Sequence, residues 1–474
     1  MSLKYGIRKI LYYGSHHLFY ERLMKLNILL LCNKPKVGKD ANTIVDHIEA
    51  FECYSGHRIW LYSNLGDLPD KLQLNKFDVI IIHYSLCLLY RSYISKKSKR
   101  KLRNYSGLKV VFIQDEYRQI NKMIDELAFL KIDTLFTCFP EHEMHRVYEE
   151  TKLPGVSKYS NLTGYIPQRL TDINNIPPPM NTRPLHVGYR GRQLPFWYGA
   201  LAYEKWNIVE KWMQYAHRDD LRIDVSFNER DRLYGEEWIN FLSSCKTTLG
   251  VESGASVMDF TGELEKIIDM YQLMHPNETF HSVQKKYLSE HENKYKLNQI
   301  SPRCFEAIAL KTVLVLYEGE YSNILIPGRH YIALRKDFSN IEDVLSCIRD
   351  DDFLQNMADV AYQEIALNPQ YSYQTFIERV DGILSSEFTA RAKKSVIDPY
   401  EKSLFQHDIN HVSLKNKLYK IGLIKYQKFP QGLRRVVKGC VRPELVVRYL
   451  ARRFFSLLHP AQKEKINVNK NDPT

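Results

Sequence analysis

The 474-residue sequence contains no run of 18 apolar residues, and its first 25 residues contain no continuous apolar stretch. The first absence argues against a membrane-spanning helix, and the second predicts that no secretory signal peptide is present. Glycine (21) and proline (19) are scarce enough to exclude collagen-like and low-complexity classes. The remaining composition, 44% apolar and 26% charged, is typical of a globular protein of two or three domains.

Familiar metal and cofactor motifs are also missing. The eight cysteines form no Cys-x-x-Cys pair, which predicts reduced, buried thiols in a cytosolic protein. Residues 142–146 lack the second histidine of a zinc-binding HExxH motif. Residues 34–40 contain Gly-Lys but lack the first glycine and the Ser/Thr of a phosphate-binding loop. An Asp-x-Asp stands at residues 350–352, in a helical stretch and not at a strand end. We therefore expect no metal and no bound cofactor.

The net charge of +12 is concentrated at the two ends of the chain. Residues 411–459 hold twelve basic residues and one acid, residues 1–25 hold five basic residues and one acid, and residues 26–410 carry a net −4. An acidic body argues against a nucleic-acid partner. Within the basic tail, Arg448 and Arg452 share one helical face while apolar residues share another, which favours an anionic membrane surface as partner. A further basic run, residues 96–103, is interpreted as a solvated helix face.

Strand and helix patterns alternate in two series. Apolar strands are predicted at residues 26–33, 57–63, 77–85, 108–117 and 134–139, and again at 185–191, 222–227, 247–254, 312–319 and 330–334. This alternation predicts an α/β protein with two Rossmann-like, doubly wound lobes. The predicted parts are a basic N-terminal segment (1–25), a first lobe (26–165), a proline-rich linker (166–184), a second lobe (185–384) and a basic helical tail (385–474). Ligands of such a protein bind in the cleft between the lobes.

The most informative block spans residues 298–334. A helix is predicted to begin at Ser301, where free N–H groups and Arg303 are suited to hold a phosphate. Glu306, one turn later, is suited to accept from ribose hydroxyls, and the following strand ends in the polar residues Glu320, Tyr321 and Ser322. The alternative is a capped helix with an internal Arg303–Glu306 pair.

Two other strand ends of the second lobe carry polar residues. Arg190 and Arg192 flank a glycine and are suited to clamp a phosphate, or else form a surface pair. Glu252 and Ser253 follow the next strand, where they are suited to contact a base or sugar, or else form a tight turn with a solvated carboxylate.

In the first lobe, His83, Asp115 and Glu116 stand at strand ends that face the same cleft. Each is a candidate base for the proton of an acceptor hydroxyl, and each is otherwise a strand-end cap. Gln114 and Tyr117 are lesser candidates for acceptor contacts.

The block at 298–334 resembles the nucleotide-sugar-binding segment of group 1 (family 4-like) glycosyltransferases with the GT-B fold. That family has Glu-x7-Glu before small residues and a Val-rich strand; Glu306 matches the second Glu, and Asn298 stands at the first. The resemblance implies that Glu306 holds the donor ribose, that the donor is a nucleotide sugar, and that transfer occurs with retention.

The resemblance extends to enzymes of bacterial O-antigen and capsule polysaccharide assembly. It implies a glycan or lipid-linked acceptor and possible contacts with other polysaccharide-assembly enzymes. The basic and apolar tail, residues 411–459, predicts peripheral attachment to the inner face of the cytoplasmic membrane. Two alternatives stay open at this point: a two-lobed epimerase-type enzyme acting on sugar nucleotides, and a non-catalytic binding module on the membrane.

Overall fold

The computed structural model describes residues 25–36, 38, 40–172, 177–216, 218, 220–391, 399–410 and 414–427. The first lobe is built on a parallel six-stranded sheet of order β2-β1-β3-β4-β5-β6. Its strands are β1 (Asn27–Cys32), β2 (Arg58–Ser63), β3 (Val79–Ile82), β4 (Leu108–Phe112), β5 (Thr134–Thr137) and β6 (Ser157–Ser160). Its helices are α2 (Asn42–Tyr54), α3 (Lys96–Arg103), α4 (Ile120–Leu130) and α5 (Glu141–Val147), with a short η1 (Leu74–Lys76).

Strand side chains alternate between two cores, because successive residues of a strand point to opposite faces. Leu29, Leu31 and Ile80 pack on the side of α3 and α4, whereas Ile28 and Leu30 pack on the side of α2. Helices therefore cover both faces of the sheet, as the near-continuous apolar strands predict.

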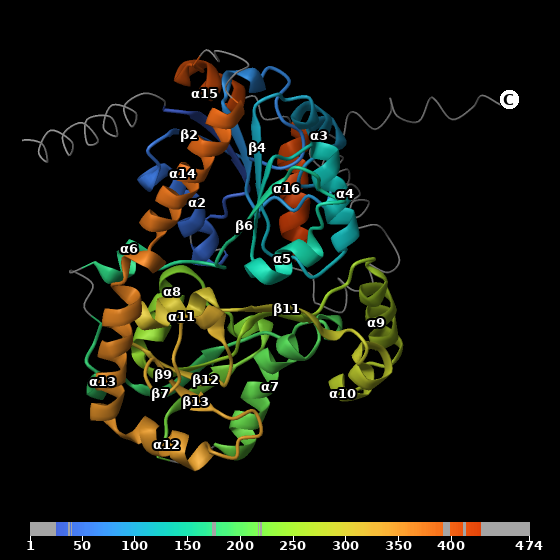
Figure 1. The fold of residues 1–474 in the computed structure, drawn as a ribbon. Coiled ribbons are helices and arrows are strands. Elements are labelled where there is room, and N and C mark those ends of the chain that lie inside the picture. The colour runs from blue at the N-terminus through green and yellow to red at the C-terminus, as the bar shows by residue number, and fades with distance from the viewer. Residues whose placement is uncertain are drawn as a thin grey trace, which may run out of the picture.

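The second lobe has a parallel five-stranded sheet of order β13-β12-β9-β7-β8. Its strands are β7 (Leu185–Arg190), β8 (Ile223–Ser226), β9 (Cys245–Gly250), β12 (Val313–Tyr317) and β13 (Tyr331–Leu334). Its helices are η3 (Phe196–Tyr198), α7 (Ala200–Tyr215), η4 (Glu229–Asp231), α8 (Gly235–Ser244), α11 (Pro302–Ala309), η6 (Tyr321–Asn323), α12 (Ile341–Arg349), α13 (Asp351–Ala361), η7 (Tyr362–Ala366) and η8 (Pro369–Tyr371). Two doubly wound parallel sheets confirm the predicted fold class (Figure 1).

An additional unit, residues 253–299, lies between β9 and α11 and is called the bridging segment. It pairs β10 (Ser253–Val257) with β11 (Glu292–Gln299) in antiparallel fashion and carries α9 (Glu263–Met274), α10 (Phe280–Val283) and η5 (Gln284–Leu288). The sequence predicted a single strand over 247–254, but the chain turns after Gly250, so that this stretch contributes to two different sheets.

The bridging segment is joined to the first lobe. The Asp259 N–H donates to the Tyr117 carbonyl at 2.9 Å, and the Asn121 N–H donates to the Phe260 carbonyl at 3.0 Å. Arg118 forms an ion pair with Glu265 at 2.6 Å. Residues of the segment and of the first lobe also share one apolar core.

The described residues of the linker region contact both lobes. Its helix α6 (Gln168–Thr171) places Arg169 in an ion pair with Asp46 of the first lobe at 2.9 Å, and η2 (Met180–Thr182) precedes β7. Arg183 is buried and donates to the carbonyls of Cys245 and Leu310 in the second lobe.

The chain then returns from the second lobe to the first, as the orange helix in Figure 1 shows. Helix α14 (Tyr373–Arg391) buries Phe376, Ile377 and Val380 against α2 and the first sheet. The helices α15 (Lys402–Asn410) and α16 (Leu414–Gln427) follow. Tyr400 and Phe405, in the described part of the predicted tail, are buried in the first lobe's core, so this part packs on the first lobe and is not a separate unit.

Residues 1–24 of the predicted N-terminal segment and residues 428–474 of the predicted tail, Arg448 and Arg452 among them, lie outside the described residues. Within the described part of the chain, no helix is long and apolar enough to cross a bilayer.

Candidate active site

A cavity of about 410 Å³ lies between the two lobes. It is lined where strands of both sheets end: Gln114 and Asp115 follow β4, Arg192 follows β7, and Val251 follows β9. A second hollow of about 460 Å³ shares many of its lining residues and extends it toward α2 and α8. The cleft therefore has the position that ligand sites take in open α/β sheets.

Cationic side chains of the second lobe gather on this cavity. Arg192, Lys205, Arg232 and Arg303 all line it. The Arg303 guanidinium lies over the Trp238 ring at 5.3 Å and donates to the Arg190 carbonyl. Arg232 pairs with Glu229 at 2.9 Å, on the rim. Four cations on one cavity have the charge and the hydrogen-bond donors suited to a multiply charged anion such as a diphosphate.

Lys205, on α7, was not predicted from the sequence. Its amine has no hydrogen-bond or ion-pair partner among the residues that the structure describes. Burial, together with the nearby guanidinium groups of Arg192 and Arg303, lowers the pKa of this amine to about 8. The sequence feature that could have identified Lys205 is its place on the α-helix that follows the strand ending at Arg190.

Arg190 was predicted to bind the donor, but its side chain is held by other groups of the protein. It borders the second hollow, but its guanidinium is already engaged: it pairs with Asp224 at 2.7 Å, donates to the carbonyls of Tyr189 and Asp224, and lies over the Phe241 ring at 4.2 Å. The side chain therefore fixes the edge of the sheet, and Arg192 is the arginine of this pair that lines the main cavity.

The amino end of α11 forms one wall of the cavity, as predicted. Ser301 caps the helix by accepting from the Arg303 N–H, and Ser301, Arg303 and Ser253 all line the cavity. Glu306 lies deeper and borders the second hollow. It accepts from the Trp238 indole N–H at 2.8 Å and forms no ion pair with Arg303, and burial raises its pKa.

The structure does not bring Glu252, Glu320, Tyr321 or Ser322 to the cavity. Instead the Glu252 carboxylate accepts from the backbone N–H groups of Glu320 and Tyr321, at 3.1 and 2.9 Å. The Tyr321 hydroxyl donates to the Tyr317 carbonyl, the Ser322 hydroxyl accepts from the Ile300 N–H, and Glu320 pairs with Lys296. These four residues hold the loop after β12 in place, which is a structural role.

Of the three predicted first-lobe residues, Asp115 reaches the cavity, which Asp40 of the same lobe also lines. Its side chain is exposed in the cleft and accepts from the Tyr117 hydroxyl at 3.0 Å. Gln114 and Tyr117, the lesser candidates, line the same wall. Asp115 thus faces the cationic wall from the opposite lobe.

Glu116 and His83 point away from the cavity, contrary to prediction. Glu116 is buried and accepts from the Thr137 hydroxyl, the Cys138 N–H and the Tyr148 hydroxyl; burial raises its pKa to about 8. His83 is fully buried between His47 and Ser85. Its Nδ1 accepts from the Ser85 N–H at 3.0 Å, so His83 Nε2 carries the proton toward His47 Nδ1. Both residues stabilise the first lobe from within.

No known protein family profile matches the sequence, and no curated protein sequence matches it. Solved structures with a similar arrangement include trehalose-6-phosphate synthase OtsA, at 10% identity over 76% of this chain and 99% of that one, with a TM-score of 0.43. An alpha-glucosyltransferase in complex with UDP and a 13-mer DNA shares 11% identity over 76% and 100% of the chains, with a TM-score of 0.42. T4 phage BGT in complex with its UDP-glucose substrate shares 11% identity over 78% of this chain and 99% of that one, with a TM-score of 0.39. Likenesses this distant do not define the chemistry of the site.

Proposed function

We propose that the chain is a GT-B glycosyltransferase that moves a sugar from a nucleotide-sugar donor to a growing glycan or lipid-linked acceptor. The observation that carries the proposal is the opposition of charges across one cleft: Arg192, Lys205 and Arg303 on the second lobe face Asp115 on the first. An epimerase-type reaction on one bound sugar nucleotide needs no such acceptor wall.

In the proposed reaction, the bond between the sugar's anomeric carbon and the diphosphate oxygen breaks while a bond to the acceptor oxygen forms. Negative charge grows on the leaving diphosphate. The three cations stabilise that charge in the cleft, where contacts to a developing charge are stronger than in bulk water. This arrangement supports a metal-independent reaction, because the protein's own cations supply the countercharge.

Asp115 is the group proposed to position the acceptor hydroxyl and to accept its proton. With retention, which the family resemblance implies, the hydroxyl approaches on the same face as the departing phosphate. Glu306 is proposed to hold the donor ribose from the second hollow.

The cellular setting proposed for this reaction is the assembly of a bacterial surface polysaccharide, O-antigen or capsule, at the inner face of the cytoplasmic membrane. Its support is the basic and apolar tail sequence over 411–459 and the resemblance of residues 298–334.

A panel of nucleotide sugars tests the function. The full-length protein should bind one or more of them and hydrolyse or transfer the sugar. Lys205→Met, Arg192→Ala and Arg303→Ala should each weaken nucleotide binding by about 1.5–3 kcal/mol, and Asp115→Asn should lower turnover about 10²–10⁴-fold with binding retained. Arg349→Ala, which removes an exposed arginine paired with Asp220, is the matched control. Absence of binding to every nucleotide sugar would contradict the proposal.

Metal independence is tested in the same assay. Transfer should persist in EDTA. Loss of activity in EDTA and its recovery with magnesium or manganese would contradict the metal-independent mechanism while leaving the donor site in place.

A further inference from the structure

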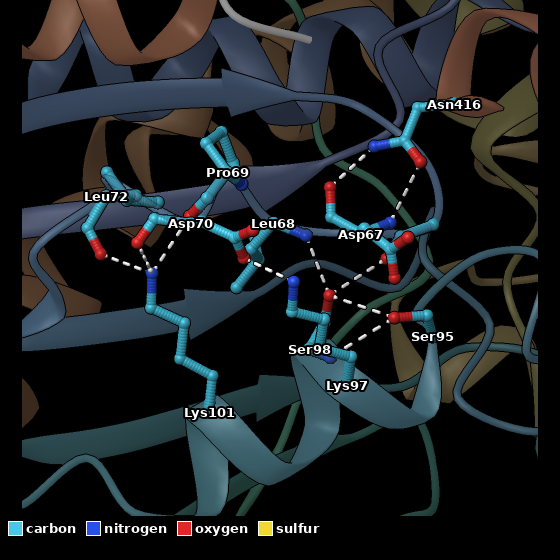
Figure 2. A network of polar contacts seen from close by, with 11 residues as sticks. Asp67, Leu68, Pro69, Asp70, Leu72, Ser95, Lys97, Ser98, Lys101 and Asn416 are labelled. Carbon is cyan, nitrogen blue, oxygen red and sulfur yellow. Dashed lines mark hydrogen bonds and ion pairs between the residues drawn. The ribbon is translucent and has the colours of Figure 1, made fainter. Parts of the chain in front are cut away.

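Helix α3 is unusual in this body because six of its eight residues are basic and none is acidic, whereas residues 26–410 as a whole carry a net −4. Figure 2 shows how the helix is held. Ser98 accepts from the Leu68 N–H at 2.7 Å and donates to the Gly66 carbonyl at 3.0 Å, and Lys101 donates to the carbonyls of Pro69 and Leu72. One face of α3 is therefore fixed to the loop at residues 66–72.

Helix α16 is attached to the same loop. The Asn416 side chain accepts from the Asp67 N–H at 3.0 Å and donates to the Asp67 carbonyl. Ser98 and Asn416 thus bind neighbouring loop residues, Leu68 and Asp67 (Figure 2). Two basic helices, far apart in the sequence, become neighbours on the first lobe.

The two helices expose positive charge. On α3, Lys96, Lys97 and Arg100 are exposed; on α16, Lys417 and Lys425 are exposed. Among the nearby acids, Asp70 pairs with Lys97 and Glu126 pairs with Lys99, so part of the charge is compensated. Lys96, Arg100 and Lys417 have no ion-pair partner among the described residues.

An apolar residue lies within this charge. Ile421 is 39% exposed and stands one turn from Lys417 and one turn from Lys425, so the three line up along α16. Lysines flanking an exposed aliphatic side chain are typical of helices that lie at a bilayer surface, where the charges meet anionic headgroups and the apolar group enters the interface. A nucleic-acid phosphate backbone offers nothing to Ile421.

We propose that this basic face, formed by Lys96, Lys97, Arg100, Lys417, Ile421 and Lys425, docks the first lobe on an anionic lipid bilayer. It rests on the proposed membrane attachment and adds a second contact, made by the folded lobe itself. Charge complementarity selects the partner, and the chain leaves α16 at Gln427 directly into the basic and apolar sequence 428–459. Each basic residue near such a surface contributes about fivefold to binding at moderate salt.

The test is vesicle binding by the full-length chain. Vesicles of phosphatidylcholine with about 30% of the anionic lipid phosphatidylglycerol are compared with vesicles of pure phosphatidylcholine. The variant Lys96→Glu with Arg100→Glu and Lys417→Glu should bind anionic vesicles at least tenfold more weakly, and Ile421→Ser should weaken the binding that survives high salt. A control variant, Lys266→Glu with Lys285→Glu and Lys294→Glu, changes net charge equally at exposed sites of the bridging segment and should bind like the unmodified protein.

Unchanged melting temperatures and nucleotide affinity will show that each variant is folded. Equal binding by the charge-reversal and control variants would overturn the inference and leave the tail as the attachment. If the unmodified protein binds no vesicles, the proposed membrane attachment fails and the inference with it. Tighter binding to duplex DNA than to anionic vesicles, lost on reversal, would assign the face to nucleic acid and also overturn it.

Discussion

At the scale of single residues, the pKa of Lys205 gives the cleft a sensitivity to pH. In the proposed function a diphosphate contacts the protonated amine, whose pKa is lowered to about 8 by burial and by the nearby Arg192 and Arg303. We expect nucleotide affinity to be constant below about pH 7 and to fall above pH 8, by up to about tenfold per pH unit. Calorimetric titration of a nucleoside diphosphate from pH 6.5 to 9.5 measures this directly.

Lys205→Arg is the control for this prediction. Arginine keeps its charge over that range, so the fall in affinity should flatten. An equally steep fall in the variant would assign the titration to another group.

Glu116 makes a prediction about stability. Its carboxyl has a pKa of about 8 in the folded protein and an ordinary value of 4.5, so the folded state holds a proton that the unfolded state has lost between these values. The free energy of unfolding should therefore decrease as pH rises from about 5 to 8, by at most ~1.4 kcal/mol per pH unit. Glu116→Gln should remove this slope and retain turnover. Urea unfolding of the unmodified protein and of Glu116→Gln at four pH values measures this slope. If the free energy of unfolding changes with pH in parallel for the two proteins, the assignment to Glu116 is wrong.

Neighbouring residues also show how far the site could be predicted. Ser301, Arg303, Arg192 and Asp115 were predicted correctly to line the cleft, because a polar residue at a strand or helix end is visible in sequence. Sequence does not reveal which way such a side chain turns after the strand ends. Asp115 and Glu116 are adjacent, yet one enters the cavity and the other the core.

At the scale of elements, the buried parallel strands were predictable and the bridging segment was not. Strands such as β1, β3 and β12 are continuous apolar runs. In contrast, β11 is mostly polar and has no apolar run, and its pairing with β10 joins residues far apart in sequence. The contacts of Glu252 and of residues 320–322 depend on that same arrangement, so the sequence did not reveal that these residues lie away from the cavity.

The Arg118–Glu265 pair makes the bridging segment testable. Both side chains are largely buried, at 17% and 8% exposure, so removing one partner leaves an uncompensated charge. Arg118→Met should lower the free energy of unfolding by about 3 kcal/mol, and adding Glu265→Met should restore part of it. Chemical denaturation of the single and double variants measures the coupling; additive losses would mean that the pair does not stabilise this contact.

At the scale of the whole molecule, the return of the chain to the first lobe determines where it can be shortened. Tyr400 and Phe405 pack on Trp60 and Phe77, and all four are buried. A chain ending at Arg391 should be about 3–6 kcal/mol less stable than one ending at Gln427, since burying each aromatic side chain is worth about 1.5–3 kcal/mol.

Thermal unfolding of the two shortened proteins, with nucleotide binding measured in parallel, checks this prediction. Equal melting temperatures would mean that α15 and α16 contribute nothing to the first lobe.

The core shared by the first lobe and the bridging segment has a consequence for recombination. Enzymes assembled from a donor half and an acceptor half can in principle acquire new specificity by swapping one half between relatives. Here a crossover in the linker at residues 172–184 would separate the bridging segment from its own first lobe. The contacts that Tyr117, Arg118 and Asn121 make with the segment would then be lost. A viable chimera would have to carry the bridging segment together with its own first lobe. Under the proposed function, a new donor preference is therefore more accessible through point changes around Arg192, Lys205 and Glu306 than through exchange of whole lobes.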